Sequence, residues 1–384
     1  MSALVQALPE QARTARATPA LHTLSDSEDV EVRALLHARA MSGRIQVCMT
    51  REPRFQTAAE VEGVRHALFV DRDPRNGKVV ALGTRSERPV YVGGSPALVG
   101  YLGQLRIAPG ASGIKRLRAG FDALAASRRA DELTFDLTSI VADNLPARRL
   151  LERGLTGLPR YESLGLLQSL VLSTRPALLR RRIADCPGLR AATWADLHDI
   201  EVLLRVHGRE YDFAPVWTAR DLEPNGRTRA LRIEDWLVIE HSGRIVACGA
   251  VWDQRSFKQT RVAGYAPWLA HIRPALNLCL RAVGQPTLPR APSTLSMGYL
   301  SHLAAPDHGT LLRLIRALRE QARARGLDQL VLTLADRDPR MASVKATFSA
   351  RSYPSILYAV HPSGSSSTST TGCLNVPFLE AATL

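Results

Sequence analysis

From about residue 30 onward, the apolar residues of each segment recur with one of two spacings. Apolar residues that recur every three or four positions predict helices, and short apolar or alternating runs predict strands. In the first half of the chain, helices are expected at 30–41, at 113–129 and from residue 143 or 144, and strands at 67–71, 79–84, 99–107, 133–140 and 161–172. In the second half, helices are expected at 196–209, at 311–325 and from about residue 338, and strands at 236–240, 244–252, 296–304 and 330–334. This order is typical of an α/β or α+β fold with mixed, mostly antiparallel sheets flanked by helices.

One sequence pattern, Gly-Tyr-Leu-x-x-Leu, occurs twice, at residues 100–105 and 298–303. Each copy is followed by a proline, a loop of small residues and an amphipathic helix. Such internal similarity predicts one structural unit used twice, and a length of 384 residues suits two domains. We therefore expect homologous domains at 30–175 and 186–362, a flexible segment at 1–29 and a tail at 363–384. The proline-rich stretch 267–292 is interpreted as an insertion in the second domain.

The chain carries a net charge of +14, most of it from arginine. An arginine-rich proteome would account for this charge, and so would an anionic partner such as a polyphosphate cofactor or a nucleic acid. Aromatic residues make up only 5% of the chain, and no RNA-binding aromatic motif is present, which disfavours nucleic acid. Five scattered cysteines without zinc-finger spacing and the lack of a long apolar run favour a cytoplasmic protein with no metal and no membrane partner.

The loop between the predicted strand 99–107 and the predicted helix 113–129 is a candidate anion site. A helix that begins directly after a loop offers unpaired backbone N–H groups and the positive end of its dipole. Gly110 and Gly113 would allow the backbone to approach a phosphate, and Lys115 and Arg116 add positive charge. Glycines between a strand and a helix also serve simply as turn residues, so the loop alone leaves both interpretations open.

The order of strand, loop, amphipathic helix, strand and Asn144-initiated helix resembles the GNAT family of acetyl-CoA-dependent N-acyltransferases. In that family the loop binds the coenzyme A pyrophosphate, and its motif reads roughly Val-x-Pro-x-x-Arg/Gln-Gly-x-Gly-Ile-Gly. The Val, Pro, Arg/Gln and first Gly positions are here Ile107, Pro109, Ser112 and Gly113. Lys115 and Leu117 replace the second and third glycines. The resemblance extends over nearly the whole chain as a tandem pair and is closest over residues 100–161.

The resemblance implies acetyl-CoA as the donor and a small-molecule or peptide amine as the acceptor. The implied acetyl-CoA-binding residues are Arg106, Ile107, Ser112, Gly113, Ile114, Lys115, Arg116 and Asn144. A strand backbone N–H near Ile107 would polarise the thioester carbonyl for direct attack by the amine, without a covalent intermediate. A homodimer is also possible.

The acid and base of such a reaction are not evident from the sequence. Gln104 occupies the region where a family glutamate often accepts the proton, and Leu151 stands where a tyrosine often protonates the thiolate. Tyr161 and Tyr101 are substitutes by proximity, although each is also a reasonable packing residue. In the second copy, His302 takes the place of Gln104, either as a base or as a core histidine.

The second copy of the loop, residues 305–310, is shorter, has one glycine and carries Asp307. A carboxylate at this position repels phosphate, although it caps the following helix well. We therefore expect the first unit to bind acetyl-CoA and the second to shape the acceptor site or an interface. The aromatic stretch 213–217 could line an acceptor pocket or pack in the core. The alternative function is a catalytically degenerate acyl-CoA sensor or scaffold.

Overall fold

The computed structural model describes residues 17–18, 24–38, 40, 43–111, 113–175, 186–223, 227–283, 285–364 and 375–384. Ser112 lies outside the described residues, as do most of the 1–29 segment and about half of the 363–384 tail. We use the term first unit for the described elements up to Ser173 and second unit for those from Leu189 onward. The exact domain boundaries stay predictions.

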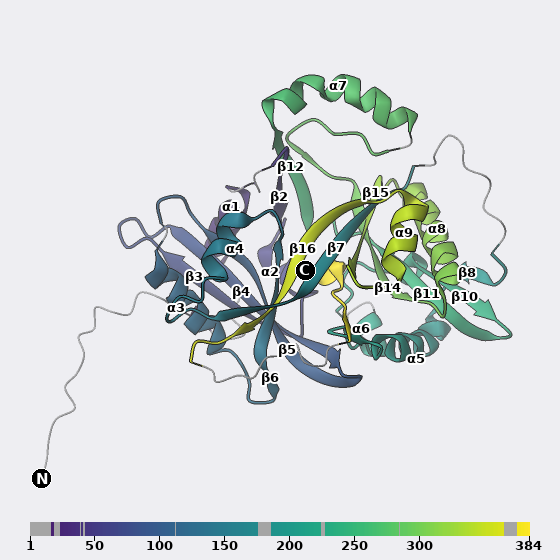
Figure 1. Ribbon diagram of the computed structural model, residues 1–384, viewed down its shortest axis with the longest axis horizontal. Helices are drawn as coiled ribbons and strands as arrows, with labels where there is room; N and C mark the ends of the chain where they lie inside the picture. Colours follow the sequence, from purple (N-terminus) through teal and green to yellow (C-terminus); the bar gives the residue numbers. More distant parts are fainter. Residues whose placement is uncertain are drawn as a thin grey trace, which may run out of the picture.

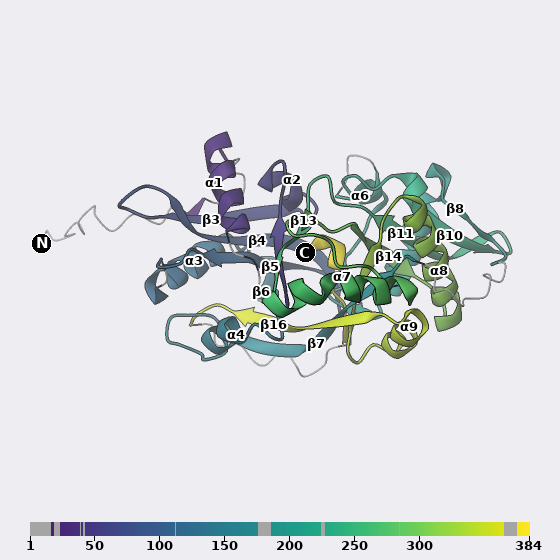
Figure 2. The same ribbon diagram turned by 90° about the horizontal axis from the view of Figure 1, so that it is seen from above.

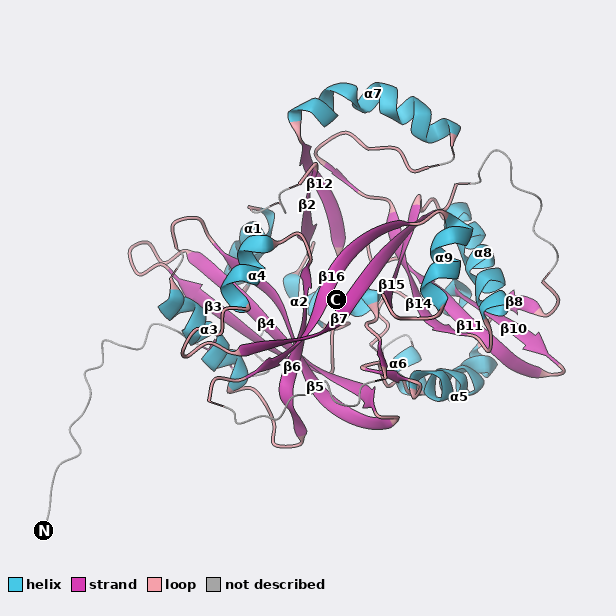
Figure 3. Ribbon diagram, in the orientation of Figure 1, coloured by secondary structure: helices cyan, strands magenta, loops and turns pink. Residues whose placement is uncertain are grey.

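The first unit contains the predicted elements in the predicted order, together with β1, β2 and α2, which were not predicted (Figures 1 and 3). It consists of β1 (Ala17–Thr18), α1 (Asp26–His37), β2 (Ile45–Thr50), α2 (Phe55–Ala59), β3 (Arg65–Arg72), β4 (Val79–Val92), β5 (Ser95–Ile107), α3 (Ile114–Ala125), β6 (Glu132–Val141), α4 (Leu145–Leu151) and β7 (Arg160–Ser173). Helix α1 begins four residues earlier than its apolar stripe predicted, because Ser25 and Glu28 form a capping box. The hairpin predicted between β3 and β4 is confirmed, and its turn closes with Gly77 N donating to Asp73 O.

The second unit repeats this order with one insertion. It consists of β8 (Leu189–Ala191), α5 (Leu197–Gly208), β9 (Tyr211–Asp212), α6 (Ala219–Leu222), β10 (Trp236–His241), β11 (Arg244–Trp252), β12 (Gln259–Tyr265), α7 (Pro267–Ala282), β13 (Ser293–Thr294), β14 (Met297–Ala304), α8 (His308–Ala324), β15 (Gln329–Ala335), α9 (Arg340–Phe348), β16 (Arg351–His361) and β17 (Val376–Pro377). The proline-rich stretch contains a 16-residue helix, α7, with Pro274 inside it. A small separate sheet of β13, β12 and β2 connects this insertion to the first unit.

The sheets of the two units join into one sheet of 12 described strands, in the order β1-β3-β4-β5-β6-β16-β7-β15-β14-β11-β10-β8. The last strands of the two units are exchanged. Strand β16 of the second unit pairs with β6, with Ile356 opposite Ile140, whereas β7 of the first unit pairs with β15, with Leu170 opposite Leu332. Figure 2 shows β16 and β7 crossing between the two halves of the molecule. The expected mixed, mostly antiparallel sheets are therefore present, and they are continuous.

The repeated pattern marks the same irregularity in both units, a β-bulge. In β5, Gln104 and Leu105 together lie opposite the single residue Gly83 of β4, since Leu82 pairs with Arg106 and Thr84 with Gly103. In β14, His302 and Leu303 lie opposite Gly249 of β11 in the same way. Both Gln104 and His302 have a positive φ, 52° and 54°. The repeat thus encodes a conformation as well as a strand.

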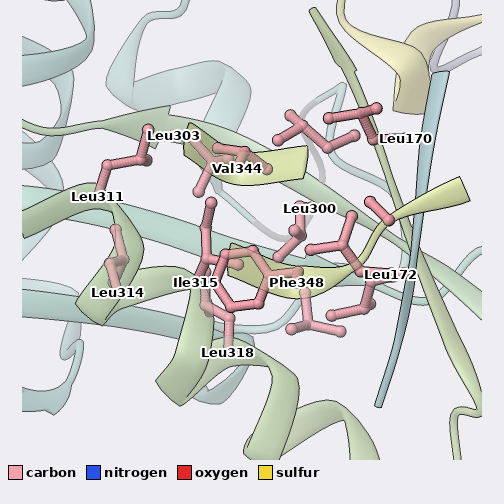
Figure 4. Close-up of a cluster of buried hydrophobic side chains, with 14 of the residues drawn as sticks. Leu170, Leu172, Leu300, Leu303, Leu311, Leu314, Ile315, Leu318, Val344 and Phe348 are labelled. Carbon is pink, nitrogen blue, oxygen red and sulfur yellow. The ribbon is translucent and has the colours of Figure 1, made fainter. Parts of the chain in front are cut away.

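Each bulged strand also separates from its parallel neighbour. Pairing of β5 with β6 ends at Tyr101 and Leu137, and pairing of β14 with β15 ends at Tyr299 and Val331. We call residues 102–107 and 138–141 the first splay, and residues 300–304 and 332–335 the second splay. The second splay lies against a cluster of buried apolar side chains from α8 and α9, part of which Figure 4 shows.

Candidate functional site

Large apolar side chains are exposed around the first splay. They come from the ends of β5 and β6 and from the helices that follow these strands. Between 38% and 47% of each residue is accessible: Leu105 42%, Ile114 44%, Val141 46%, Leu145 47% and Leu150 38%. Covering such surface contributes about 25 cal/mol per Å². This end of the first unit is therefore suited to bind a partly apolar ligand.

The N-terminus of α3 opens beside these residues and has no side-chain cap. Gly113 is the N-cap residue, and among the described residues it leaves the first turn without a side-chain cap hydrogen bond. A Cβ added at Gly113 would meet no atom within 4 Å, so the space around it is open. Lys115 is exposed and makes no hydrogen bond or ion pair with any residue that the structure describes. The free N–H groups and this ammonium suit an anionic group such as a phosphate.

The corresponding end of α8 in the second unit is closed by a carboxylate. Asp307 Oδ1 accepts a hydrogen bond from Thr310 N at 2.9 Å, and Oδ2 accepts one from the Thr310 hydroxyl at 2.6 Å. These hydrogen bonds lower the pKa of Asp307. An anion at this helix end would replace a cap and meet a negative charge, as the sequence led us to expect.

The remaining predicted cofactor residues lie near the same loop but have other contacts. Arg116 forms an ion pair with Asp71 and donates to the Ala111 carbonyl. Arg106 donates to the Leu105 carbonyl at 2.9 Å. Asn144 caps α4, with Oδ1 accepting from Ala147 N at 3.4 Å, and Ile107 packs on the cluster beneath α3. Gly113, Ile114, Lys115 and Asn144 are the exposed members of the set, and the binding role of every member stays a prediction.

The structure does not bring Tyr161 and Tyr101 together. Tyr161 packs edge-on against Phe121 and Tyr358, with ring centroids 6.4 and 5.6 Å away, in the cluster beneath α3. Tyr101 belongs to the cluster on the opposite face of the sheet, because neighbouring strand residues alternate between faces. Its hydroxyl lies 2.8 Å from the Ser139 hydroxyl, across the start of the first splay. Burial raises the pKa of both tyrosines, so both carry a proton at neutral pH.

A small cavity lies on the Tyr101 face of the sheet, beside Leu137 at the start of the first splay, between the two units. The guanidinium of Arg88, one of its wall residues, stacks on the Tyr101 ring at 3.9 Å. The cavity holds about 20 Å³, room for a single water molecule. Its walls are Val61, Glu62, Arg88, Pro89, Val90, Leu137, Phe213, Pro215, Arg227, Leu379, Glu380 and Thr383. The aromatic stretch 213–217 thus contributes two residues to this cavity, which we call the interunit cavity.

Glu380 is the wall carboxylate that has no cationic partner among the described residues. The other wall acid, Glu62, is paired with Arg51, and the wall residue Arg227 is paired with Asp221 at 2.7 Å. Glu380 accepts a hydrogen bond from His302 N, the backbone of the second bulge, at 3.3 Å. Burial raises the pKa of Glu380 to about 7, where a carboxylate is an effective proton acceptor.

Sequence reasoning missed Glu380, although one signal pointed to it. It is the only acidic residue in the largely apolar run Val376–Leu384. That run folds into the centre of the molecule, where its end is labelled in Figure 1. An acid in a buried apolar segment carries a desolvation cost and is therefore a candidate for a functional role.

His302 is a buried core residue. Its ring lies 4.4 Å from the centroid of Trp217 and 4.7 Å from that of Trp236. Burial lowers the pKa of His302 to about 3, so the ring is neutral at physiological pH. No group of three or more His, Cys, Asp or Glu side chains in the described part of the chain is arranged to hold a metal ion.

No protein-family model and no curated protein sequence matches the chain. Solved structures that are similar to it include Saccharomyces cerevisiae N-myristoyltransferase, a tandem GNAT fold, with bound myristoyl-CoA. One such structure has a TM-score of 0.59 at 12% identity and covers 98% of this chain and 87% of its own. Another has a TM-score of 0.58 at 13% identity, with coverages of 93% and 85%. At these identities the similarity establishes the fold alone.

Proposed function

We propose that this chain, which has the fold of two tandem GNAT-like units, is an acyl-CoA-dependent N-acyltransferase that transfers an acetyl group to an amine. The main observation in support of the proposal is that the uncapped N-terminus of α3 and a group of exposed apolar residues occur together at the first splay. Acetyl-CoA is the donor that the sequence resemblance implies. Myristoyl-CoA is bound by the similar yeast enzyme, so acyl-chain length is the first property to measure.

The donor would bind at the first unit. Its pyrophosphate would accept hydrogen bonds from the first backbone N–H groups of α3, with the Lys115 ammonium beside it. Its pantetheine arm would lie along the first splay, where Leu105 and Val141 are exposed. The bulge at Gln104 turns the strand backbone there. A backbone N–H group of this part of the strand, predicted near Ile107, would polarise the thioester carbonyl.

The amine would approach from the side of the interunit cavity, which would have to widen beyond its room for one water molecule. Its nitrogen attacks the thioester carbonyl carbon while its proton passes to the Glu380 carboxylate. The carbon–sulfur bond then breaks, and the departing thiolate takes the hydroxyl proton of Tyr101, which the proton held by Glu380 replaces by way of solvent, so that both groups are restored. We assign this acid role to Tyr101 rather than Tyr161 because Tyr101 contacts the cavity wall through Arg88 and Tyr161 lies in the cluster on the other face. The products are an amide and free coenzyme A.

Isothermal titration with coenzyme A, acetyl-CoA and myristoyl-CoA tests the donor site. We expect saturable binding to the wild type and at least tenfold weaker binding to Gly113→Glu, which places a carboxylate at the uncapped helix end. Gly113→Gln is the matched control, since it adds nearly the same volume without the charge, and should bind with affinity much closer to that of the wild type. Wild-type protein that binds none of the three ligands would contradict the proposal.

Turnover is measured separately, as thiol release from acetyl-CoA in the presence of a panel of small-molecule and peptide amines. Release that depends on the amine supports the transferase. Binding without release from any amine would instead favour the acyl-CoA sensor, a function to which one observation also points. Leu151, at the position of the family's tyrosine acid, is a buried side chain with 6% exposure and has no proton to donate.

A further inference from the structure

Helix α7, in the insertion of the second unit, stands away from the body of the molecule (Figures 1 and 3). Its only buried residue is Leu269. One side of the helix is fixed to the returning chain, because Asn277 exchanges hydrogen bonds of 2.9 and 2.8 Å with the backbone of Leu288. Arg273 donates to the same carbonyl at 3.2 Å. The helix is therefore tethered along one side, and its other side is free.

The free side of α7 is apolar. Trp268, Ile272, Leu278 and Val283 are 53%, 48%, 67% and 61% exposed. With Ala275, Cys279 and Ala282 they occupy an arc of about 140°, at 100° per residue, which includes one polar residue, His271. We call this arc the α7 apolar face. An exposed face of this width on a helix that does not pack on the body indicates a surface that meets a partner.

The charges in the chain segment that carries the α7 apolar face are all of one sign. No aspartate or glutamate occurs between Asp253 and Asp307, and the stretch 261–290 carries four arginines. Arg281 and Arg290 are exposed, and Arg273 is half-buried. Two copies of α7 packed face to face would bring these cations together with no acidic residue to pair with them. The surface is therefore complementary to an anionic partner with an apolar interior.

We propose that α7 binds the surface of an anionic lipid bilayer. The apolar face, with Trp268 near one end, would enter the boundary between headgroups and acyl chains, while Arg281 and Arg290 contact lipid phosphates. A helix of 16 residues is about 24 Å long and would lie in the interface. No described helix is long and apolar enough to cross a membrane. The proposal departs from the sequence expectation of no membrane partner and does not depend on acyl-CoA binding.

Vesicle flotation of the full chain tests this proposal. We expect binding to vesicles of phosphatidylcholine and phosphatidylglycerol at 7:3, much weaker binding to pure phosphatidylcholine, and at least a threefold loss of binding in 0.5 M NaCl. Trp268→Ser/Ile272→Ser should reduce binding at least tenfold. The matched control is Trp194→Ser/Val206→Ser, which removes a tryptophan and a β-branched residue that are 52% and 59% exposed on other elements. This control should bind as the wild type does.

Three results would overturn the proposal. The first is a wild type that does not bind the anionic vesicles, and the second is equal behaviour of the two double variants. The third comes from sedimentation velocity without lipid: a wild-type dimer that only Trp268→Ser/Ile272→Ser converts to monomer would identify the α7 apolar face as a contact between two copies. Far-UV circular dichroism of both variants confirms that any loss of binding is not a loss of fold.

Discussion

The first and second splays contain the same bulge, but the bulge leucine points in different directions. Leu303, in the second splay, is 7% exposed, and a Cβ added at the facing Gly249 would lie 2.6 Å from its Cδ2 atom. Leu105, its counterpart, is 42% exposed, and a Cβ at the facing Gly83 would meet Leu124 at 3.3 Å instead. The second unit thus fills its splay with its own side chain, and the first leaves that surface uncovered.

The helix ends beside the two splays differ in the same sense. Asp307 closes the N-terminus of α8, whereas Gly113 leaves that of α3 open. The backbone N–H of the second bulge, at His302, is likewise bonded to Glu380. Each feature that would bind a ligand in the first unit is satisfied internally in the second. From this difference we infer that the same backbone conformation, present in both units, is open for a ligand in the first and closed by internal contacts in the second.

The largest effect is expected where the second unit would assist the first, at Glu380. Glu380→Gln keeps the shape and the acceptor for His302 N but cannot take a proton, so kcat should fall about 10²–10³-fold. Because the pKa of Glu380 is raised to about 7, the wild-type rate should rise with pH through 7, as the carboxyl loses its proton, and then level off. The variant should lack this rise. A pH–rate profile of Glu380→Gln that parallels the wild type would exclude this residue as the base.

Truncating the core that fills the second splay should affect stability alone. Leu314, on α8, is fully buried, so Leu314→Ala should lower the free energy of unfolding by about 2–5 kcal/mol, through lost burial and the cavity left behind. Urea denaturation measures this change. Titration with acetyl-CoA under conditions where the variant is folded should give the wild-type dissociation constant. A large loss of affinity would mean that the second unit takes part in donor binding.

The opposite result, weaker binding with unchanged stability, is expected for Leu105, the exposed leucine of the first splay. Leu105→Ala should change the free energy of unfolding by no more than about 0.5 kcal/mol, since the side chain packs on little in the free protein. It should weaken acyl-CoA binding about threefold to tenfold, because the ligand would cover it. Titration and urea denaturation of the same preparation separate the two quantities. Unchanged affinity together with reduced stability would reverse the roles that we give to the two splays.

The smallest effect is expected at the α8 cap. Asp307→Ala should cost about 1 kcal/mol of unfolding free energy at neutral pH. The pKa of Asp307 is lowered by folding, so its stabilisation is present above the ordinary pKa of 3.8 and lost as pH falls through the folded-state value. The difference between variant and wild type should therefore shrink in acid. Acyl-CoA should still bind with a stoichiometry of one, because loss of the α8 cap leaves the second splay filled by its own apolar side chains.

Local sequence patterns predicted the features that depend on neighbouring residues. The period of apolar residues located most helices and strands, and the Gly-Tyr-Leu-x-x-Leu repeat identified two strands that prove to share a bulge. The glycine loop before α3 was likewise visible, because a loop that enters a helix is a short-range pattern. The tandem GNAT resemblance is confirmed at the level of the fold.

Features that depend on distant residues could not be predicted in this way. The spacing of apolar residues in β16 does not indicate that this strand pairs with β6 rather than with β15, because an apolar strand is compatible with either neighbour. The position of Glu380 depends on the path of the last segment to the centre of the molecule. The stretch 267–292 was interpreted only as a proline-rich insertion, and its helix α7 was not predicted. In the structure Pro267 starts this helix and Pro274 is accommodated inside it.

The exchange of β7 and β16 also determines when the chain can complete its fold during synthesis. When a ribosome has made the first unit, β6 has no partner on one side, and it acquires one only after Arg351–His361 has emerged. Strand β7 likewise lacks its neighbour β15 until that strand of the second unit has been translated. Exposed strand edges are prone to pair with other chains. The nascent first unit therefore exposes a strand edge until β16 of the second unit has been translated.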